Sequence, residues 1–435
     1  MSSKTSGWFA TTLAALALAL VSAPVWAQTL PTAEPETVGM SSERLDRLTA
    51  TLAEYVENDQ IAGSVAIVVR RGQIAYLKSV GMRDREAGAP MADDAIFRIA
   101  SQTKALTSVC VMILQERGQL LLTDSIAKYL TEFQDRTVAV DDGRGGYNLV
   151  SARRPITIRD LLRHTSGISY GNGPGVDLWK EAGVLGWYFA KRDEPIRDTV
   201  ARMGALPAAA HPGERWVYGY NADILGALVE VVSGQPFDVF LQEEILEPLA
   251  MSDTHFYLPE EKRERLTAVY SSIAGEGIER APDPGYMDDS GIFGTIGQGQ
   301  YVDGPRKSFS GGAGLLSTAR DYATFLQMML NGGELNGVRI LRPSTVELMT
   351  VNHLEDVEFR PGQGFGLGFS VVTDLEARDV PGSVGEFGWG GAYHSTYWVD
   401  PEEDLVAVYL TQLIPAIDID DQDEFRALLY DAIVE

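Results

Sequence analysis

The octapeptide Phe97-Arg98-Ile99-Ala100-Ser101-Gln102-Thr103-Lys104 carries the most information in this chain of 435 residues. Apolar residues at helical spacing follow it, and they predict a buried helix that begins near Ser101 and ends near Gly118. Lys104 lies three residues after Ser101, so the two side chains share one face of that helix. A lysine held among apolar neighbours loses proton affinity and can serve as a base. Ser101 is therefore a candidate nucleophile, with Lys104 as its partner.

The same spacing, S-x-x-K, occurs a second time at Ser125-Ile126-Ala127-Lys128. This second copy follows Leu120-Leu121-Leu122-Thr123-Asp124, a context that is typical of a helix start. We therefore expect Ser125 to cap a helix and Lys128 to be solvated. The spacing alone leaves the role of Ser101 open, and further motifs are needed to assign it.

The composition excludes several classes of protein. The formal charge of −25 would repel phosphate backbones, so no nucleic-acid partner is expected. Cys110 is the only cysteine, which excludes an intramolecular disulfide and a cysteine-based metal site. The chain contains no H-E-x-x-H, P-loop, C-x-x-C or G-x-G-x-x-G signature. The sequence predicts neither a metal nor a cofactor.

The first 27 residues have the pattern of a signal peptide. Lys4 precedes an apolar run over residues 8–21, Pro24 interrupts that run, and Val25-Trp26-Ala27 resembles a cleavage site. The run is short for a membrane span, although an uncleaved anchor helix is the alternative. We expect an exported protein, periplasmic or secreted, whose residues 28–435 form a single domain without stable membrane insertion.

Both ends of the mature chain show the pattern of strands flanked by a helix. The expected elements are a helix over 41–58, strands over 64–69, 74–77, 394–399 and 405–411, and a C-terminal helix that contains Phe425 and Leu429. Hairpins from both ends can pair in one antiparallel sheet that helices cover. We therefore expect a sheet subdomain of about residues 40–120 and 306–435. A mostly helical subdomain, about residues 121–305, is inserted between its two parts.

Five blocks of the sequence resemble, in order, the motifs of serine β-lactamase-related proteins. They are residues 97–104, 156–168, 216–226, 311–319 and 388–392. The resemblance is closest to the family VIII carboxylesterases, which are similar to class C β-lactamases. It implies an α+β fold of the serine β-lactamase and penicillin-binding-protein type, with an antiparallel sheet flanked by helices and an inserted, mostly helical subdomain.

The resemblance also implies roles for individual residues. Ser101 would attack the substrate carbonyl and form an acyl-enzyme, while Lys104 and Tyr218 would share the proton transfers as general base and acid. The backbone N–H groups of Ser101 and Ala392 would form the oxyanion hole. Which of Lys104 and Tyr218 is the base stays open. The residues expected to bind substrate are Trp389, Gly390, Gly391, Tyr220 and Asn221.

Two motifs depart from the usual family pattern. The tyrosine motif is Tyr218-Gly219-Tyr220, with Asn221 displaced by one position, and Trp389-Gly390-Gly391 stands where K-T-G is usual. A tryptophan offers an apolar wall and cannot pair with a carboxylate as a lysine does. The departure favours neutral ester substrates over penicillins. His164, in contrast, is expected to make an ordinary structural hydrogen bond.

Three functions compete for this set of residues. The favoured one is a serine hydrolase that cleaves small-molecule carboxylic esters. The alternatives within the same fold are a β-lactamase, a D-amino-acid peptidase or a transacylase. The alternative of another class is a non-catalytic cell-wall-binding protein, which the joint presence of Ser101, Lys104 and Tyr218 disfavours. The oligomeric state stays open.

Overall fold

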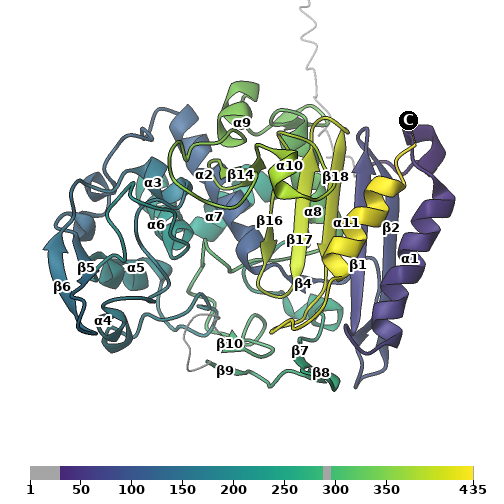
Figure 1. The fold of residues 1–435 in the computed structure, drawn as a ribbon, viewed down its shortest axis with the longest axis horizontal. Helices are drawn as coiled ribbons and strands as arrows, with labels where there is room; N and C mark the ends of the chain where they lie inside the picture. Colours follow the sequence, from purple (N-terminus) through teal and green to yellow (C-terminus); the bar gives the residue numbers. More distant parts are fainter. Residues whose placement is uncertain (1–29, 288–294, 435) are drawn as a thin grey trace, which may run out of the picture.

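The structure is a computed structural model that describes residues 30–287 and 295–434. The predicted signal peptide lies outside the described residues. A large antiparallel sheet occupies one half of the molecule, and helices with short hairpins occupy the other half (Figure 1). The described ends of the chain lie close together, because the helices α1 (Ser42–Glu57) and α11 (Asp421–Asp431) pack side by side on the sheet.

The sheet has eight strands, and each neighbouring pair in it is antiparallel. In spatial order the strands are β14 (Gln363–Phe365), β15 (Ser370–Val372), β16 (Phe387–Gly391), β17 (Ser395–Asp400), β18 (Leu405–Leu410), β1 (Gly63–Arg70), β2 (Gln73–Asp84) and β3 (Ala89–Pro90). The N-terminal and C-terminal strands meet in the middle of the sheet, where Ile67 pairs with Val408. This connection explains why the two ends of the chain fold as one unit.

The central strand β1 is buried along its whole length because helices cover both faces of the sheet. Val65, Ile67 and Val69 point into the main core, against α8 (Ala319–Leu330). Ala66 and Val68 point to the other face, where α1 and α11 cover them. Side chains of a strand alternate between faces, so a strand covered on both sides becomes a continuous apolar run.

The remaining helices lie behind the sheet or in the inserted part. They are α2 (Thr103–Glu116), α3 (Ile158–Leu162), α4 (Val176–Glu181), α5 (Ile196–Gly204), α6 (Asn221–Ser233), α7 (Phe237–Leu241), α9 (Pro343–Met349) and α10 (Leu375–Arg378). Residues 103–114 of α2 are all buried, and α2 packs against α6 and α7. Helix α2 therefore forms the centre of the molecule between the sheet and the inserted helices.

Five short strand pairs complete the described fold. They are β4 (Phe97–Arg98) with β11 (Leu316–Ser317), β5 (Thr137–Asp141) with β6 (Tyr147–Ser151), β7 (Tyr270–Ile273) with β8 (Gly277–Arg280), β9 (Tyr286–Met287) with β10 (Thr295–Ile296), and β12 (Glu334–Leu335) with β13 (Val338–Arg339).

Within the described residues no single helix is long and apolar enough to cross a membrane. Only the bent pair Asn221–Ser233 and Phe237–Leu246 meets that test, by length and composition alone.

The fold class predicted from the sequence, a sheet flanked by helices, is confirmed. The boundaries of the two subdomains at about 121 and 305 stay a prediction. The structural interpretation of the second S-x-x-K copy is also confirmed, because the Ser125 hydroxyl accepts a hydrogen bond from the Ala127 backbone at 3.3 Å. Lys128 is exposed and forms an ion pair with Asp124 at 2.9 Å.

Candidate active site

Ser101 lies in a short 3-10 turn, Ala100–Gln102, that leads directly into α2. Two contacts on the N-terminal side fix this turn. The preceding strand β4 pairs with β11, and the Ile99 N–H donates to the Leu315 carbonyl at 3.1 Å. Ala100 has a φ of 42°, a left-handed conformation that is costly for a residue with a Cβ. The strained residue directly precedes Ser101, and Ser101 lines the large cavity of the protein.

Lys104, on the first turn of α2, is buried and makes three hydrogen-bonding contacts through its Nζ atom. Its neighbours are Ser101 Oγ at 3.2 Å, the Tyr170 hydroxyl at 3.0 Å and the Gly312 carbonyl oxygen at 2.7 Å. The carbonyl can only accept, so one N–H of Lys104 points to Gly312. Each of the two hydroxyls can donate or accept. This arrangement allows a proton to pass between Ser101 and Lys104.

A buried carboxyl group supports the loop that holds Lys104. Asp223, on α6, accepts hydrogen bonds from Ser310 Oγ at 2.6 Å and from the Gly312 N–H at 3.1 Å. Burial raises the pKa of Asp223, while the hydrogen bond from Ser310 and the charge of Lys104 act in the opposite direction. A side chain at Gly312 would collide with the Asp223 carboxyl group. Gly311 and Gly312 therefore allow the loop before β11 to pass close to α6.

Tyr218 stands beside Lys104 in the loop before α6. The centre of its ring lies 4.7 Å from Lys104 Nζ, and its hydroxyl accepts a hydrogen bond from Trp389 Nε1 at 3.1 Å. The ring also packs against His164, with 5.0 Å between the ring centres, and stacks on Trp216 at 5.5 Å. The Lys104 amine therefore lies against the face of the Tyr218 ring, and the Trp389 indole N–H binds its phenol oxygen. The structure thus brings together Ser101, Lys104, Tyr218 and Trp389.

Tyr170 is a site residue that the sequence analysis missed. Its hydroxyl lies 3.0 Å from Lys104 Nζ, and its ring packs edge-on against Tyr218 at 5.6 Å. Burial and the neighbouring Tyr218 raise the pKa of Tyr170 well above 10, so its hydroxyl stays protonated at neutral pH. Tyr170 therefore serves as a neutral partner of Lys104. Only its place at the end of the 156–168 block could have drawn attention to it.

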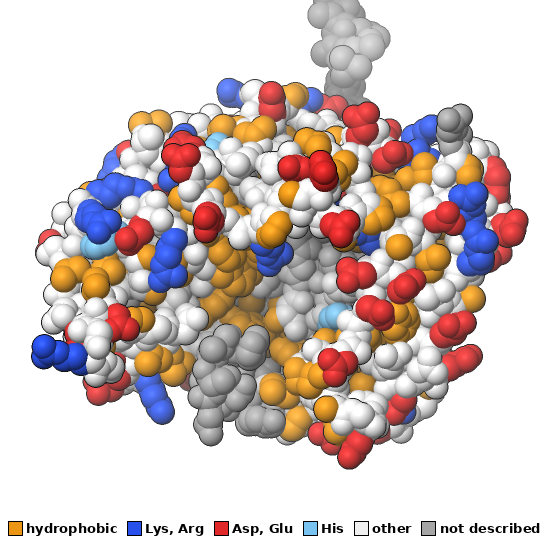
Figure 2. Space-filling model, in the orientation of Figure 1, with side chains coloured by type: hydrophobic (Ala, Val, Ile, Leu, Met, Phe, Trp, Pro, Cys, Tyr) orange, Lys and Arg blue, Asp and Glu red, His pale blue; other side chains and the backbone are white. Residues whose placement is uncertain are grey.

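The site opens into a cavity of about 710 Å³, a volume typical of a small-molecule site. Aromatic side chains dominate the part next to Ser101, namely Tyr170, Trp187, Trp216, Tyr218 and Trp389. Figure 2 shows a hollow in the middle of this face of the molecule, with hydrophobic side chains along its margin. The cavity suits an apolar group attached to a carbonyl that Ser101 attacks.

The third motif forms the end of β16 and closes the site from the side of the sheet. A Cβ atom at Gly391 would lie 2.6 Å from the Ile99 carbonyl oxygen, so only glycine allows β16 to pass this close to the Ser101 turn. Gly390, Gly391 and Ala392 all line the cavity together with Ser101. Ala392 thus lines the same cavity as Ser101, and its role in an oxyanion hole stays a prediction.

Tyr220 and Asn221 do not line the cavity, although the sequence analysis expected both to contact substrate. Tyr220 is fully buried and donates a hydrogen bond to the Gly186 carbonyl at 2.9 Å. The Asn221 amide donates to His164 Nδ1 at 2.9 Å. Asn221 starts α6, so its side chain points back into the loops behind the cavity wall. Both residues support the wall and lie away from the space where substrate would bind.

His164 makes the structural hydrogen bond that the sequence analysis expected. Burial and the charge of Lys104 lower the pKa of His164 well below its usual value, so the ring is neutral. A neutral ring accepts the Asn221 amide hydrogen and presents its face to Tyr218. The chain of contacts from Asn221 through His164 fixes the orientation of the Tyr218 ring.

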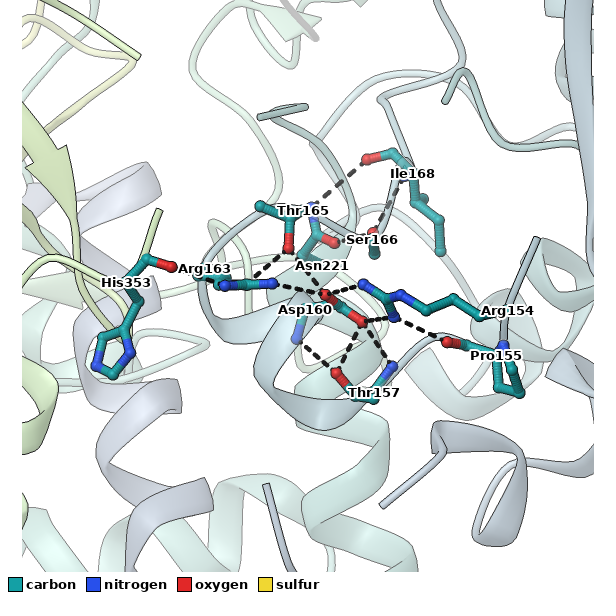
Figure 3. Close-up of polar contacts among 10 residues, drawn as sticks. All are labelled: Arg154, Pro155, Thr157, Asp160, Arg163, Thr165, Ser166, Ile168, Asn221 and His353. Carbon is teal, nitrogen blue, oxygen red and sulfur yellow. Dashed lines mark hydrogen bonds and ion pairs between the residues drawn. The ribbon is translucent and has the colours of Figure 1, made fainter. Parts of the chain in front are cut away.

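Figure 3 shows the ion-pair cluster that anchors the same loops around Asp160 of α3. Arg154 donates two hydrogen bonds to the Asp160 carboxylate, at 2.5 and 2.9 Å, and Thr157 caps the helix through a reciprocal capping box. Thr165 donates to the same carboxylate at 2.9 Å, and the adjoining Ser166 hydroxyl donates to the Asn221 side chain. The cluster therefore holds the segment that supports Tyr218.

Arginines surround the outer part of the cavity, a feature that the sequence analysis did not foresee. Arg378 and Arg426 both pair with the buried Glu386, at 2.9 and 2.8 Å. Arg360 lines the cavity as well, with its guanidinium carbon 4.9 Å from the centre of the Trp389 ring. Arg360 is far from every predicted motif in sequence, and no spacing rule connects it to Ser101.

The comparisons with known proteins agree with this fold. Residues 48–432 match the model of the β-lactamase family. An uncharacterised protein of Mycobacterium tuberculosis is 32% identical over 86% of this chain and 92% of its own length. Esterase EstB of Burkholderia gladioli is 31% identical over 84% of this chain and 89% of its own length. The solved structure of EstCE1, a hydrolase with promiscuous acyltransferase activity, has a TM-score of 0.74 and 26% identity, covering 89% of this chain and 99% of that one.

These matches extend over nearly all of the described residues. The chain therefore belongs to the β-lactamase family, and it is a serine hydrolase. The resemblance inferred from the five sequence blocks is confirmed.

Proposed function

We propose that the protein cleaves carboxylic esters through an acyl-enzyme on Ser101, with Lys104 and Tyr218 sharing the roles of general base and acid. The observation that carries the proposal is the 3.2 Å contact between Lys104 Nζ and Ser101 Oγ in a cavity that Tyr218 also lines. A nucleophile within hydrogen-bonding distance of its base is the geometric requirement for this chemistry.

The proton transfers follow from the contacts around Ser101. Lys104 or Tyr218 accepts the Ser101 proton as Oγ attacks the ester carbonyl. The Tyr218 hydroxyl, which faces the cavity, then protonates the departing alkoxide and deprotonates the water that attacks the acyl-enzyme. The Trp389 N–H stabilises the phenol oxygen whenever it carries negative charge. The N–H groups of Ser101 and Ala392 bind the oxyanion, an effect worth about 100- to 1,000-fold in rate per donor.

The aromatic wall and the relatives support esters as substrates. Trp389 occupies the position of the usual lysine, and it narrows the cavity with an apolar ring beside Tyr218. Esterase EstB and the hydrolase EstCE1 bear names that describe ester or acyl chemistry. A second candidate is acyl transfer, in which an alcohol replaces water as the acceptor. The promiscuous acyltransferase activity of EstCE1 favours this candidate over lactam or peptide hydrolysis.

One set of assays tests the proposal. Purified protein is incubated with p-nitrophenyl butyrate, a chromogenic cephalosporin and a D-alanyl peptide. We expect the ester to react fastest, and we expect Ser101→Ala to lower ester turnover at least about 1,000-fold. Ser125→Ala, at the second S-x-x-K copy, is the matched control and should keep wild-type turnover. Ester turnover that survives Ser101→Ala would refute the mechanism, and faster cephalosporin turnover would refute the substrate class.

Two additions extend this test. Adding an alcohol to the ester assay reveals acyl transfer as a new ester product. A stable acyl adduct on Ser101 without turnover would favour the non-catalytic binding protein instead.

We also propose that the protein is exported to the periplasm or the medium, because residues 1–27 have the pattern of a signal peptide. Cell fractionation with N-terminal sequencing of the mature chain tests that part.

A further inference from the structure

The cavity is lined by more positive than negative side chains, although the protein as a whole carries a formal charge of −25. Its Lys, Arg, Asp and Glu lining residues are Arg360, Arg378, Arg426 and Glu386. Arg378 and Arg426 share Glu386 as their ion-pair partner. Arg360 forms no ion pair or side-chain hydrogen bond within residues 30–287 and 295–434. Such a local reversal of charge attracts anions into the cavity.

Arg360 is positioned by aromatic rings. Its guanidinium carbon lies 4.9 Å from the centre of the Trp389 ring and 5.1 Å from that of Phe359. Those two rings are nearly parallel, with 6.3 Å between their centres. Stacking on aromatic faces suits a guanidinium because it is weakly hydrated, and it leaves the N–H groups at the edge of the plane free to donate.

The position of this cation relates it directly to the reacting groups. Trp389, on which Arg360 stacks, donates its indole N–H to the Tyr218 hydroxyl. The guanidinium is thus separated from the catalytic tyrosine by a single ring. A substrate whose carbonyl lies at Ser101 can extend along the face of Trp389 and reach Arg360 at the cavity margin.

We propose that Arg360 is a carboxylate-binding residue and that the preferred substrates are esters whose acyl or alcohol part carries a carboxylate. The inference rests on the proposed esterase function and narrows its substrate class. The third motif of this chain has Trp389 where the lysine of K-T-G is usual. The segment before β14 places Arg360 over the Trp389 ring and so supplies a positive charge near that position. A guanidinium pairs with a carboxylate through two parallel N–H donors, so orientation as well as charge selects the substrate.

Two matched pairs of esters test the proposal. For the acyl side, 4-nitrophenyl hexanoate is compared with mono-4-nitrophenyl adipate. For the alcohol side, phenyl butyrate is compared with 3-(butanoyloxy)benzoate. The readout is the ratio of kcat/KM for the charged ester to kcat/KM for the neutral one. We expect Arg360→Gln to lower this ratio about 10- to 100-fold in at least one pair, mainly through KM.

Two further variants separate the pairing geometry from charge alone. Arg360→Lys keeps the charge but loses the bidentate fork, so its ratio should lie between those of the wild type and Arg360→Gln. Arg144→Gln removes the same charge from the β5–β6 hairpin, at the far end of the molecule from α1, and should leave the ratio unchanged (Figure 1). An unchanged ratio in Arg360→Gln for both pairs would overturn the proposal.

A binding measurement distinguishes this inference from the esterase proposal. In a Ser101→Ala background, tryptophan fluorescence reports binding of 3-hydroxybenzoate, with phenol as the neutral comparison. We expect Arg360→Gln to weaken 3-hydroxybenzoate binding at least about tenfold and to leave phenol binding nearly constant. If no ester reacts but Arg360→Gln weakens 3-hydroxybenzoate binding, the esterase proposal is wrong and the carboxylate site is supported. If esters react but neither the kcat/KM ratio nor 3-hydroxybenzoate binding depends on Arg360, the esterase proposal is supported and the carboxylate site is wrong.

Discussion

At the scale of single residues, the environment of Lys104 decides the chemistry. Its Nζ atom touches a nucleophile, a phenol and a backbone carbonyl, so its position is fixed in three directions. Each of these contacts comes from a different segment: the turn before α2, the loop after α3 and the loop before β11. A small displacement of any one segment moves the amine relative to Ser101, and misplacement of catalytic groups is costly in rate.

Tyr170→Phe tests one of the three contacts. Loss of a hydrogen bond to an amine of this kind should lower kcat/KM for p-nitrophenyl butyrate about 10- to 100-fold. The Tyr170 hydroxyl is protonated at neutral pH, so the variant removes a partner of Lys104 and no base.

Tyr129→Phe is the control for this variant. It removes a phenol hydroxyl that contacts Asp124 at 2.6 Å, outside the cavity. Its kcat/KM should match that of the wild type. A Tyr170→Phe enzyme with wild-type kcat/KM would show that Tyr170 only fills space.

The residues that the structure brings together at the candidate site could be predicted from the sequence where they lie in one short motif or in recognisable blocks. Ser101 and Lys104 are three residues apart, and Tyr218 and Trp389 stand in blocks that resemble family motifs. Tyr170 and Arg360 could not be predicted, because their places depend on how distant loops fold over α2 and β16. Tyr220 and Asn221, which were expected to bind substrate, do not line the cavity for a related reason. Position next to a catalytic residue does not show which way a side chain points once a helix begins.

At the scale of the element, α3 and the loop after it form the support of the tyrosine wall. Burial alone would raise the pKa of Asp160, but the hydrogen bonds from Arg154 and Thr157 outweigh it and lower the pKa to about 2. The unfolded carboxyl group has a pKa near 3.9. The interactions of ionised Asp160 therefore stabilise the fold above about pH 4, and this stabilisation is lost as the pH falls from about 4 to 2.

Asp160→Asn should lower the free energy of unfolding at pH 7 by roughly 2–3 kcal/mol, the order of magnitude that such a pKa difference represents. The difference between variant and wild type should shrink as the pH falls toward 2. Urea unfolding at several pH values measures it. Asp46→Asn, at an exposed position on α1, is the control and should change stability by less than about 0.5 kcal/mol. A destabilisation of Asp160→Asn that stays constant from pH 7 to pH 2 would contradict the role of the charge.

At the scale of the whole molecule, the sequence predicted the sheet well because its patterns are local. The strands β1, β17 and β18 and the helices α1 and α11 lie within a few residues of their expected places, whereas β2 begins as expected and continues seven residues further, to Asp84. The hydrophobic pattern of the sequence did not predict the edge strands of the sheet. The strands β14 and β15 have three residues each, and so short a segment shows no clear alternation. Yet these strands precede β16 and carry the chain from Arg360 to the third motif.

The two chain ends and the active site belong to one sheet, and this makes a distant core residue matter for activity. Phe425 of α11 is fully buried between Tyr409 and Trp398, with ring centres 5.2 and 5.5 Å away. Trp398 lies on β17, which pairs with the Trp389 strand. Phe425→Ala should therefore lower the free energy of unfolding by about 3–5 kcal/mol through the cavity it leaves. Ile417→Ala, at a position 40% exposed, is the control and should cost far less.

The coupling predicts how Phe425→Ala loses function as well as how much stability it loses. If the sheet unfolds as one unit, esterase activity and tryptophan fluorescence should be lost in the same urea transition, at a lower midpoint than in the wild type and with an unchanged slope. The inserted helices α6 and α7 pack on α2, which begins just after Ser101, so we expect them to unfold together with the site. Activity lost at a distinctly lower urea concentration than fluorescence would mean that β16 detaches first. In that case the sheet would not unfold as one cooperative unit.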